Sequence, residues 1–520
     1  MSQRPVILVA DLGYGDAGKG SIVDCLTRQV SARTVVRYNG GAQAAHNVID
    51  PRGRHHTFAQ FGSGTLVAGV RTHLSRFMLV DPLNLLREEQ HLRALGVTDA
   101  VKRLTIDRAA LVTTPYHQAL NRLREIARNR ERHGSCGLGI GETMADALAL
   151  GERALHVGDL LEPIGLKQKL ATLRDWKITQ LPGLRADLPD TAQVRRELAV
   201  IEDAHFLDFL AETYRRLARP LTLVDSSYLA KVLADGPVIF EGAQGVLLDE
   251  WYGFHPYTTW STTTFQNAET LLREQGYAEQ VLRLGLLRAY ATRHGRGPFV
   301  TEDAALAAVL PEAHNVPNAW QLAMRVGHFD AVAARYALSL TGPIDLLAVS
   351  HLDRVRDWPQ WKIATHYQHR GEPDRLSDYF TMRAGELRDI RRSPQPDLDY
   401  QAQLTRLLEQ CVPQYQTLST RTNTIEDYLA HIARAVGVPI GLVSAGPTAL
   451  DKHFTAAWAD AQTARSPAAD QIEHAHDEAD DHDDAAQRPR LHSTGQAAAQ
   501  RAAHQGADGH DDRRQPHDLT

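Results

Sequence analysis

The sequence has 520 residues, of which 43% are hydrophobic, and it carries a formal net charge of -6 at pH 7. That length allows a large buried core and two to four domains, and the weak negative charge gives no sign of binding to nucleic acid or to a membrane. The three cysteines lie far apart, so we expect neither disulfides nor a zinc site. We also see no secretion signal and no apolar run long enough to cross a bilayer, and therefore expect a cytoplasmic protein.

The first distinctive stretch is a strand, a glycine-rich turn and a helix. An apolar run from Val6 to Ala10 predicts a buried strand, and Ser21 to Arg28 predicts an amphipathic helix. The turn between them, Gly13 to Lys19, fits G-x-x-x-x-G-K, but Gly20 follows where a P-loop has a hydroxyl. Strand, glycine loop and helix together point backbone N–H groups at an anion, usually a phosphate. The carboxylate inside this loop, Asp16, therefore needs a metal ion or a protonatable substrate group beside it.

Apolar runs and turn signals predict further elements along the chain. They are a strand over 34–38, a strand and a helix beginning at Asp81-Pro82 within 77–95, a basic helix over 116–133, a glycine loop over 134–141, a long helix over 198–218, a buried strand and glycine turn over 237–248, and a helix and the strand 439–443 within 428–447.

The composition changes near Gln462. Ala, Asp, His, Gln and Arg then dominate, large apolar residues nearly vanish and no period is visible. Such a segment cannot bury enough apolar surface to offset its ordering entropy. We predict a catalytic domain over 1–461 and a disordered tail over 462–520, whose scattered histidines have no metal-ligand spacing.

Several blocks resemble the adenylosuccinate synthetase family, in the family's order. GDAGKGSIVD is similar to the family's GDEGKGKIVD, GSCGLGIG to TTGRGIGP, PVIFEGAQGVLL to LFEGAQGTLLD, PYTTWSTT to PYVTSSNT, YATRHGRGPFVTE to YTTRVGAGPFPTE, and IDLLAVSHLD to a strand ending in TKLD. The resemblance runs from about Val6 to Phe454. It implies an α/β fold with a large, mostly parallel central sheet, helices on both faces and a P-loop-like GTP site. It also implies a homodimer.

The resemblance implies a GTP-dependent ligase of purine biosynthesis. Such an enzyme phosphorylates the 6-oxo group of a purine nucleotide, IMP or an analogue, and replaces it with an amine, which is aspartate in the family. By the same resemblance Asp16 is the base that removes the N1 proton, His46 is the general acid and Lys19 stabilises the phosphoryl charge. Mg²⁺ is the implied cofactor, held by Asp16 and the backbone carbonyl of Ala45.

The matched blocks also imply three sets of binding residues. GTP would be bound by Gly15, Gly18, Gly20, Ser21, His351, Asp353, Ser444 and Gly446. The purine substrate would be bound by Gln43, Cys136, Gln244 and Thr259. The loop for the amine donor would include Arg325 and Asp330.

The departures from the family cluster at the acceptor and amine sites. In the family's TTGRxRRxGWxD loop the first two arginines align here with Leu322 and Met324, and the threonines with Ala319 and Trp320. An arginine that the neighbouring subunit contributes aligns with Leu150, and the arginine of GRGIG aligns with Leu138. Each lost carboxylate contact should cost about 1.5–3 kcal/mol.

Three interpretations follow. One is a paralogue that still activates an oxo group with GTP but uses another acceptor or amine. A second is a true synthetase whose missing arginines are supplied by Arg293, Arg296 or Arg325. A third is a non-catalytic GTP-binding relative, against which the retained pair Asp16 and His46 argues.

Overall fold

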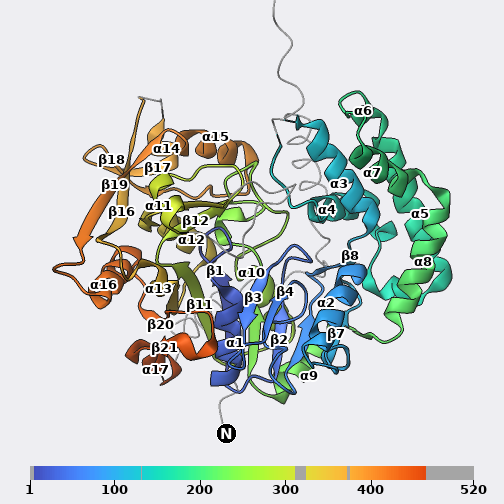
Figure 1. Cartoon of the computed structure of the whole chain (residues 1–520), viewed down its shortest axis with the longest axis horizontal. Coiled ribbons are helices and arrows are strands. Elements are labelled where there is room, and N and C mark those ends of the chain that lie inside the picture. Colours follow the sequence, from blue (N-terminus) through green and yellow to red (C-terminus); the bar gives the residue numbers. More distant parts are fainter. Residues whose placement is uncertain (1–4, 130–131, 311–323, 372–374, 464–520) are drawn as a thin grey trace, which may run out of the picture.

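The computed structural model describes residues 5–129, 132–310, 324–371 and 375–463 (Figure 1). The predicted α/β class is confirmed, because one large sheet runs through the molecule with helices on both faces. In spatial order its strands are β21 (Lys452–Phe454), β20 (Ile440–Ser444), β15 (Leu346–Ser350), β11 (Val281–Arg288), β1 (Val6–Asp11), β10 (Val238–Glu241), β2 (Thr34–Arg37), β5 (Arg71–Leu74), β7 (Leu104–Asp107) and β9 (Thr222–Val224). Among these strands all neighbours are parallel except β20 and β21.

The sheet is covered by helices because its central strand is apolar on both sides. Successive side chains of a strand point to opposite faces. In β1, Ile7 and Val9 pack in one cluster with Ile22 and Leu26 of α1 (Lys19–Gln29). The alternate residues of β1 pack in another cluster with α9 (Tyr228–Asp235) and α10 (Gln266–Glu274). This double burial is typical of parallel sheets.

Two additional parts flank the sheet (Figure 1). A helical part contains α3 (Pro115–Ala127), α4 (Ile140–Leu150), α5 (Pro163–Gln180), α6 (Pro182–Arg185), α7 (Ala192–Glu202) and α8 (Ala204–Ala218). A smaller sheet on the other side joins β14 (Phe329–Asp330), β16 (Gln360–His369), β17 (Phe380–Arg383), β18 (Glu386–Ile390) and β19 (Cys411–Ser419).

The remaining elements are short connections and covering helices. The strands form three two-stranded pairs: β3 (His46–Ile49) with β4 (His55–Phe58), β6 (Leu79–Val80) with β8 (Leu111–Val112), and β12 (Ala291–His294) with β13 (Met324–Gly327). The helices are α2 (Pro82–Ala94), α11 (Ala304–Val309), α12 (Ala331–Thr341), α13 (Leu352–Val355), α14 (Leu376–Tyr379), α15 (Leu398–Leu408), α16 (Ile425–Val436) and α17 (Ala456–Thr463). Within the described ranges no helix combines the length and the apolar character that crossing a membrane requires.

Two of the predicted helices are corrected. The single helix expected over 198–218 is wrong, because the chain breaks at Asp203, whose carboxylate caps α8 by accepting a hydrogen bond from the backbone N–H of His205. The basic helix expected over 116–133 ends at Ala127. The predicted start at Asp81-Pro82 is confirmed, since Asp81 caps α2. The proposed tail boundary falls inside α17, and residues 464–520 lie outside the described part of the chain.

Candidate active site

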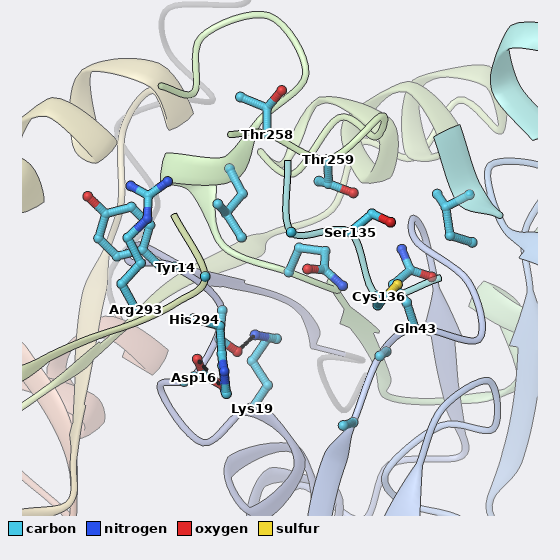
Figure 2. Close-up of a pocket in the computed structure, with 18 of the residues that line it drawn as sticks. Tyr14, Asp16, Lys19, Gln43, Ser135, Cys136, Thr258, Thr259, Arg293 and His294 are labelled. Atoms are coloured by element: carbon cyan, nitrogen blue, oxygen red, sulfur yellow. Dashed lines mark hydrogen bonds and ion pairs between the residues drawn. The ribbon is translucent and has the colours of Figure 1, made fainter. Parts of the chain in front are cut away.

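A cavity of about 1160 Å³ lies at the carboxyl ends of the parallel strands (Figure 2). Segments that follow β1, β2, β10, β11, β15 and β20 all contribute to its wall. Ligands in open α/β sheets bind at this edge. The cavity brings together sixteen of the residues expected from sequence: Gly15, Asp16, Gly18, Lys19, Gly20, Ser21, Gln43, Ala45, His46, Cys136, Gln244, Thr259, His351, Asp353, Ser444 and Gly446.

The glycine loop after β1, residues 13–20, is called the phosphate loop below, and it wraps around one buried carboxylate. Asp11 accepts hydrogen bonds from the backbone N–H groups of Gly13 at 2.8 Å, Gly15 at 3.3 Å and Ala17 at 2.7 Å. The ammonium of Lys19 donates to Asp11 at 3.1 Å and to the carbonyl of Gly15 at 2.7 Å. Asp11 is therefore a positioning residue that the sequence analysis missed, although its place at the end of an apolar strand was a signal.

Glycines let the neighbouring loops approach the phosphate loop closely. A Cβ on Gly20 would lie 2.6 Å from the carbonyl oxygen of Asn47, so only glycine lets the start of α1 pack against β3, which carries His46. A Cβ on Gly245 would lie 2.2 Å from the carbonyl oxygen of Gly13. These two close approaches hold β3, which carries His46, and the turn at Gly245 against the phosphate loop.

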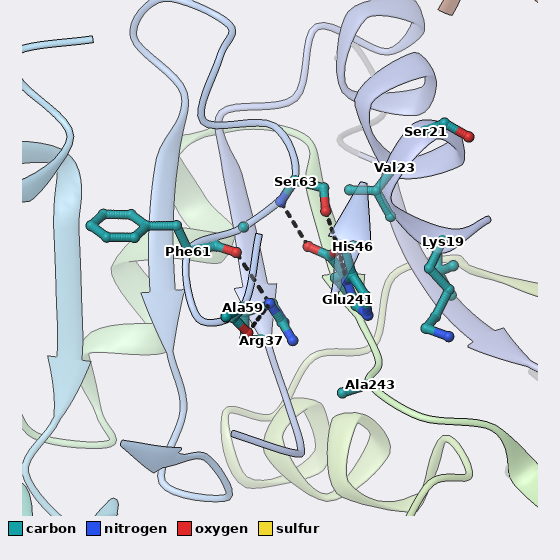
Figure 3. Close-up of polar contacts among 12 residues, drawn as sticks. Lys19, Ser21, Val23, Arg37, His46, Ala59, Phe61, Ser63, Glu241 and Ala243 are labelled. Atoms are coloured by element: carbon teal, nitrogen blue, oxygen red, sulfur yellow. Dashed lines mark hydrogen bonds and ion pairs between the residues drawn. The ribbon is translucent and has the colours of Figure 1, made fainter. Parts of the chain in front are cut away.

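His46 is paired with a buried carboxylate (Figure 3). Its Nδ1 lies 2.6 Å from Oε1 of Glu241, which ends β10. The carboxylate also accepts hydrogen bonds from the backbone N–H and the hydroxyl of Ser63. Sequence reasoning missed Glu241, whose only signal was a charge at the end of an apolar strand.

The electrostatic environment of His46 and Glu241 sets which of the two groups carries a proton. Burial would raise the pKa of Glu241, but the nearby charge of Arg37 and the contact with His46 outweigh it and lower that pKa to about 2. Burial lowers the pKa of His46 to about 4, against the opposing effect of Glu241. The arrangement is a neutral imidazole that donates from Nδ1 to an ionised carboxylate, which leaves Nε2 for chemistry.

Asp16 lies next to a second histidine, His294, which sequence reasoning missed (Figure 2). Oδ2 of Asp16 is 3.9 Å from Nε2 of His294, the last residue of β12. Burial raises the pKa of Asp16, while the charges of His294 and Arg288 lower it. A carboxylate whose pKa is raised is a better proton acceptor at neutral pH.

The residues expected to bind guanine gather at the ends of β15 and β20. Nδ1 of His351 lies 2.8 Å from the hydroxyl oxygen of Ser350, and burial lowers the pKa of His351 well below its usual value. Lys452 donates to the carbonyl of Gly446 at 2.7 Å. Burial lowers the pKa of that ammonium to about 8.

Two non-glycine residues of the cavity wall adopt the left-handed backbone region. Gln244 has φ +65° and His351 has φ +61°. Such a conformation costs of order 1 kcal/mol and persists where the surroundings enforce it, often at ligand sites. Both residues are ones that the resemblance assigns to nucleotide binding.

The wall expected to bind the purine substrate carries polar side chains, one of which has no partner in the part of the chain that the structure describes. Both amide atoms of Gln43 are shielded and have no hydrogen-bond partner within the described residues. Burial raises the pKa of the Cys136 thiol, and the adjacent Ser135 hydroxyl accepts from Asn121 at 3.0 Å. Glu250, another residue that the sequence analysis missed, also lines the cavity, and burial raises its pKa to about 7.

The two residues expected in the amine-donor loop do not line the large cavity. Arg325 pairs with Glu302 at 2.9 Å and donates to the carbonyl of Gly297 at 2.7 Å. Asp330 caps α12 and accepts from the hydroxyl of Tyr367 at 2.7 Å, and burial raises its pKa to about 6. Asp330 instead borders a small adjoining cavity of about 60 Å³.

The other loop positions are placed as follows. Met324 begins β13, whereas 319, 320 and 322 lie outside the described residues. Arg293 and Arg296 line the cavity, but the guanidinium of Arg293 donates to the carbonyls of Arg296 and Pro298 and lies over the ring of Tyr14. Leu150, at the position of the intersubunit arginine, is buried in its own chain.

The chain is similar in sequence to proteins of one known family. A family model described as adenylosuccinate synthetase matches residues 8–452. The adenylosuccinate synthetase of Desulfovibrio desulfuricans is 31% identical over 452 residues, which cover 83% of this chain and 96% of that protein. The adenylosuccinate synthetase of Ectopseudomonas mendocina is 32% identical over 454 residues, which cover 85% and 96%.

Solved structures share the fold. A fully ligated adenylosuccinate synthetase from Plasmodium falciparum has a TM-score of 0.68 at 20% identity, covering 86% of this chain and 99% of that chain. The succinoaminodeoxyadenylate synthetase of cyanophage S-2L, bound to dGMP and to dATP as an energy donor, has a TM-score of 0.52 at 16% identity, covering 91% and 99%. At these identities the similarity concerns the fold.

Proposed function

The chain belongs to the adenylosuccinate synthetase family and is a ligase, and from that premise we propose that it uses GTP to replace the 6-oxo group of a purine nucleotide with an amine. The acceptor is IMP or a close analogue, the amine donor is aspartate, and the co-products are GDP and phosphate. The observation that carries the proposal is the gathering of sixteen family-matched residues around one cavity.

The reaction needs two steps because oxide is a very poor leaving group. In the first step O6 attacks the γ-phosphorus of GTP, the bond to the β,γ-bridging oxygen breaks, and GDP leaves. In the second step the amine nitrogen attacks C6, the C6–O6 bond breaks, and phosphate leaves with the original O6. The amine nitrogen then loses a proton.

Asp16 removes the proton from N1 of the purine in the first step. This makes O6 a better nucleophile because negative charge moves onto it. The partly buried position of Asp16 and the raised pKa of its carboxyl support the role, since they favour proton uptake.

His46 stabilises the transferring phosphoryl group. Its Nδ1–H is held by Glu241, so Nε2 binds a proton from water as negative charge develops nearby, and the resulting Nε2–H donates to a phosphoryl oxygen. The ionised Glu241 then stabilises the imidazolium. Lys19 and the N–H groups of the phosphate loop supply the remaining positive potential.

The site suits Mg²⁺. Its donors are the Asp16 carboxylate and the Ala45 carbonyl, which are hard oxygen atoms on the cavity wall, and Mg²⁺ binds through one or two such groups plus substrate phosphates. When bound, the ion neutralises charge on the phosphate oxygens.

A second candidate is the same ligase with a different purine acceptor. Cys136 and Leu138 replace the polar residues expected around the substrate phosphate, and Glu250 adds a carboxyl group to the cavity. The cyanophage synthetase with a similar fold is bound to dGMP. Acceptors that carry an exocyclic amino group therefore belong in any substrate panel.

A homodimer is proposed from family membership. Leu150 aligns with the arginine that the neighbouring subunit contributes in the family, but it is buried in its own chain, so this residue has no role in a partner's site. Light scattering with on-line chromatography tests the dimer.

The test of function is product analysis by mass. The full chain is incubated with GTP, Mg²⁺, IMP and aspartate, and then with GMP and dGMP in place of IMP. We expect GTP-dependent formation of the succino-adduct with at least one acceptor. The Asp16→Asn variant should lose about 10²–10⁴-fold in turnover, which is the usual contribution of a general base. Equal turnover in both proteins would contradict the proposal.

A further inference from the structure

In the two-stranded ribbon of β12 and β13, two paired positions differ from the family: one has lost an arginine and the other has gained a histidine. Met324 of β13 stands where the family's loop has its second arginine, and its direct cross-strand partner in the antiparallel register is His294 of β12. Directly paired side chains lie on the same face with Cβ atoms about 4.5–5.5 Å apart. In the aligned motif YTTRVGAGPFPTE the family has valine where this chain has His294. The basic group has therefore changed strand but stays on the same face of the ribbon.

His294 is placed to contact a ligand. It lines the large cavity, about a quarter of its side chain is exposed, and its Nε2 is 3.9 Å from the carboxylate of Asp16 (Figure 2). Its Nδ1 is shielded and has no hydrogen-bond partner among the residues that the structure describes, so Nε2, the nitrogen beside Asp16, is the one that can meet a ligand. An amine that attacks the purine close to Asp16 would bring its own acid group next to this ring.

The arginines of the ribbon are already occupied. Arg293 is held by the carbonyls of Arg296 and Pro298, and Arg325 is held by Glu302. They are poor replacements for the missing carboxylate ligands because binding a substrate would require breaking these contacts.

Arg296 belongs to another part of the cavity. A Cβ on Gly134 would lie 4.0 Å from the backbone nitrogen of Arg296, so the two loops are neighbours. Gly134 begins the loop expected to hold the substrate phosphate. Arg296 is therefore better placed for that phosphate than for the amine donor.

We propose that His294 makes the carboxylate contact that Met324 cannot make, and that it selects an amino acid with an acidic side chain as the amine donor. This inference rests on the proposed function because it places the donor beside Asp16. The Nε2–H of His294 donates a hydrogen bond to the carboxylate of the amino acid. His294 therefore affects which amino acid is used, and not phosphoryl transfer.

The test is calorimetric titration of L-aspartate into the full chain with IMP and GDP present. Four variants are compared: His294→Val, the double variant His294→Val with Met324→Arg, His294→Asn, and His369→Val as a matched control. His369 ends β16 in the smaller sheet and lines neither cavity. Circular dichroism and thermal melting check that each variant folds.

We expect His294→Val to weaken aspartate binding about tenfold or more, as loss of one strong hydrogen bond predicts. The double variant should regain most of the affinity, because the cation returns on β13. His294→Asn should keep part of it and His369→Val all of it. L-asparagine should bind weakly to the unmodified chain.

Product analysis in parallel separates the two proposals. If adenylosuccinate forms and His294→Val binds aspartate normally, the inference is wrong and the function stands. If no adenylosuccinate forms but aspartate binding depends on His294, the inference stands and the acceptor is wrong. If the unmodified chain does not bind aspartate, the inference is wrong.

Discussion

At the scale of single residues, the pair formed by His46 and Glu241 gives the first prediction. Glu241→Gln keeps the size of the side chain but removes the charge that stabilises an imidazolium at His46. We expect kcat for GTP-dependent phosphate release to fall about 10²–10⁴-fold with little change in the KM for GTP. The measurement is steady-state kinetics on folded protein.

Ser63→Ala is the matched control for that variant. It removes one hydrogen-bond donor to Glu241 but leaves its carboxylate beside His46. A kcat of Glu241→Gln within threefold of the Ser63→Ala value would contradict the role assigned to the pair.

Glu250 gives a prediction about pH. Its pKa is raised from 4.5 to about 7 by burial, so the folded state binds this proton more tightly than the unfolded state does. The free energy of unfolding should therefore decrease as the pH rises from about 4.5 to about 7 and show no further change from this group above that range. Glu250→Gln should remove about 1–3 kcal/mol of this decrease.

Urea unfolding at pH 5 and pH 8 measures the difference for the unmodified chain and the variant. Other groups titrate in both proteins, and the comparison between them isolates Glu250. An equal loss of stability in both proteins over this pH interval would contradict the assignment.

At the scale of elements, Asp11 organises the phosphate loop. Asp11→Asn removes the charge that compensates Lys19 and weakens three backbone hydrogen bonds. Breaking a buried ion pair by removing one partner typically costs about 3–5 kcal/mol. We expect a loss of about 2–4 kcal/mol in the free energy of unfolding, because asparagine keeps one acceptor, and a higher KM for GTP.

The control is Asp235→Asn, which removes one partner of an exposed ion pair with Arg71. Exposed pairs contribute about 0–1 kcal/mol, so this variant should unfold nearly as the unmodified chain does. Equal stability of the two variants would show that Asp11 does not hold the loop.

The elements at the sheet's carboxyl edge could be predicted from sequence because their signals are local. The strand predicted over Val6 to Ala10 matches β1 (Val6–Asp11), and the helix predicted over Ser21 to Arg28 lies within α1 (Lys19–Gln29), because the apolar run and the glycine turn are adjacent in the chain. The break at Asp203 could not be predicted from apolar spacing, since the periodic pattern continues through it. The break coincides with the cap at Asp203, whose carboxylate accepts from the backbone N–H of His205.

The loops that line the cavity could be predicted from the sequence, but the pairs of side chains that contact each other within it could not. His46 on β3 and Glu241 at the end of β10 are 195 positions apart. Asp16 lies in the phosphate loop after β1, whereas His294 ends β12, so only the tertiary fold brings each pair together. Arg325 and Asp330 were expected in the amine-donor loop, but their side chains are engaged elsewhere, in contacts to Glu302 and Tyr367. The contact to Tyr367 depends on packing against the smaller sheet, and the contact to Glu302 depends on the bridge between Glu302 and Gly327 at the end of β13. No local pattern in the sequence indicates either arrangement.

At the scale of the whole molecule, the C-terminal helix α17 belongs to the folded domain. Trp458 is buried and lies 4.7 Å from Phe454, measured between ring centroids. We expect Trp458→Ala to lower the free energy of unfolding by about 3–5 kcal/mol. A chain that ends at Thr463 should keep the melting temperature and the activity of the full chain. Calorimetric melting of both proteins checks this, and a lowered melting temperature of the shortened chain would contradict the proposed domain boundary.

The central claim is that the purine 6-oxo group is transferred to phosphate. The most direct measurement uses IMP labelled with ¹⁸O at the 6 position, together with GTP, Mg²⁺ and aspartate, and analyses the released phosphate by mass. One ¹⁸O atom is expected in each phosphate that accompanies product, because the C6–O6 bond breaks and O6 leaves with phosphorus. Product formation with unlabelled phosphate would contradict it.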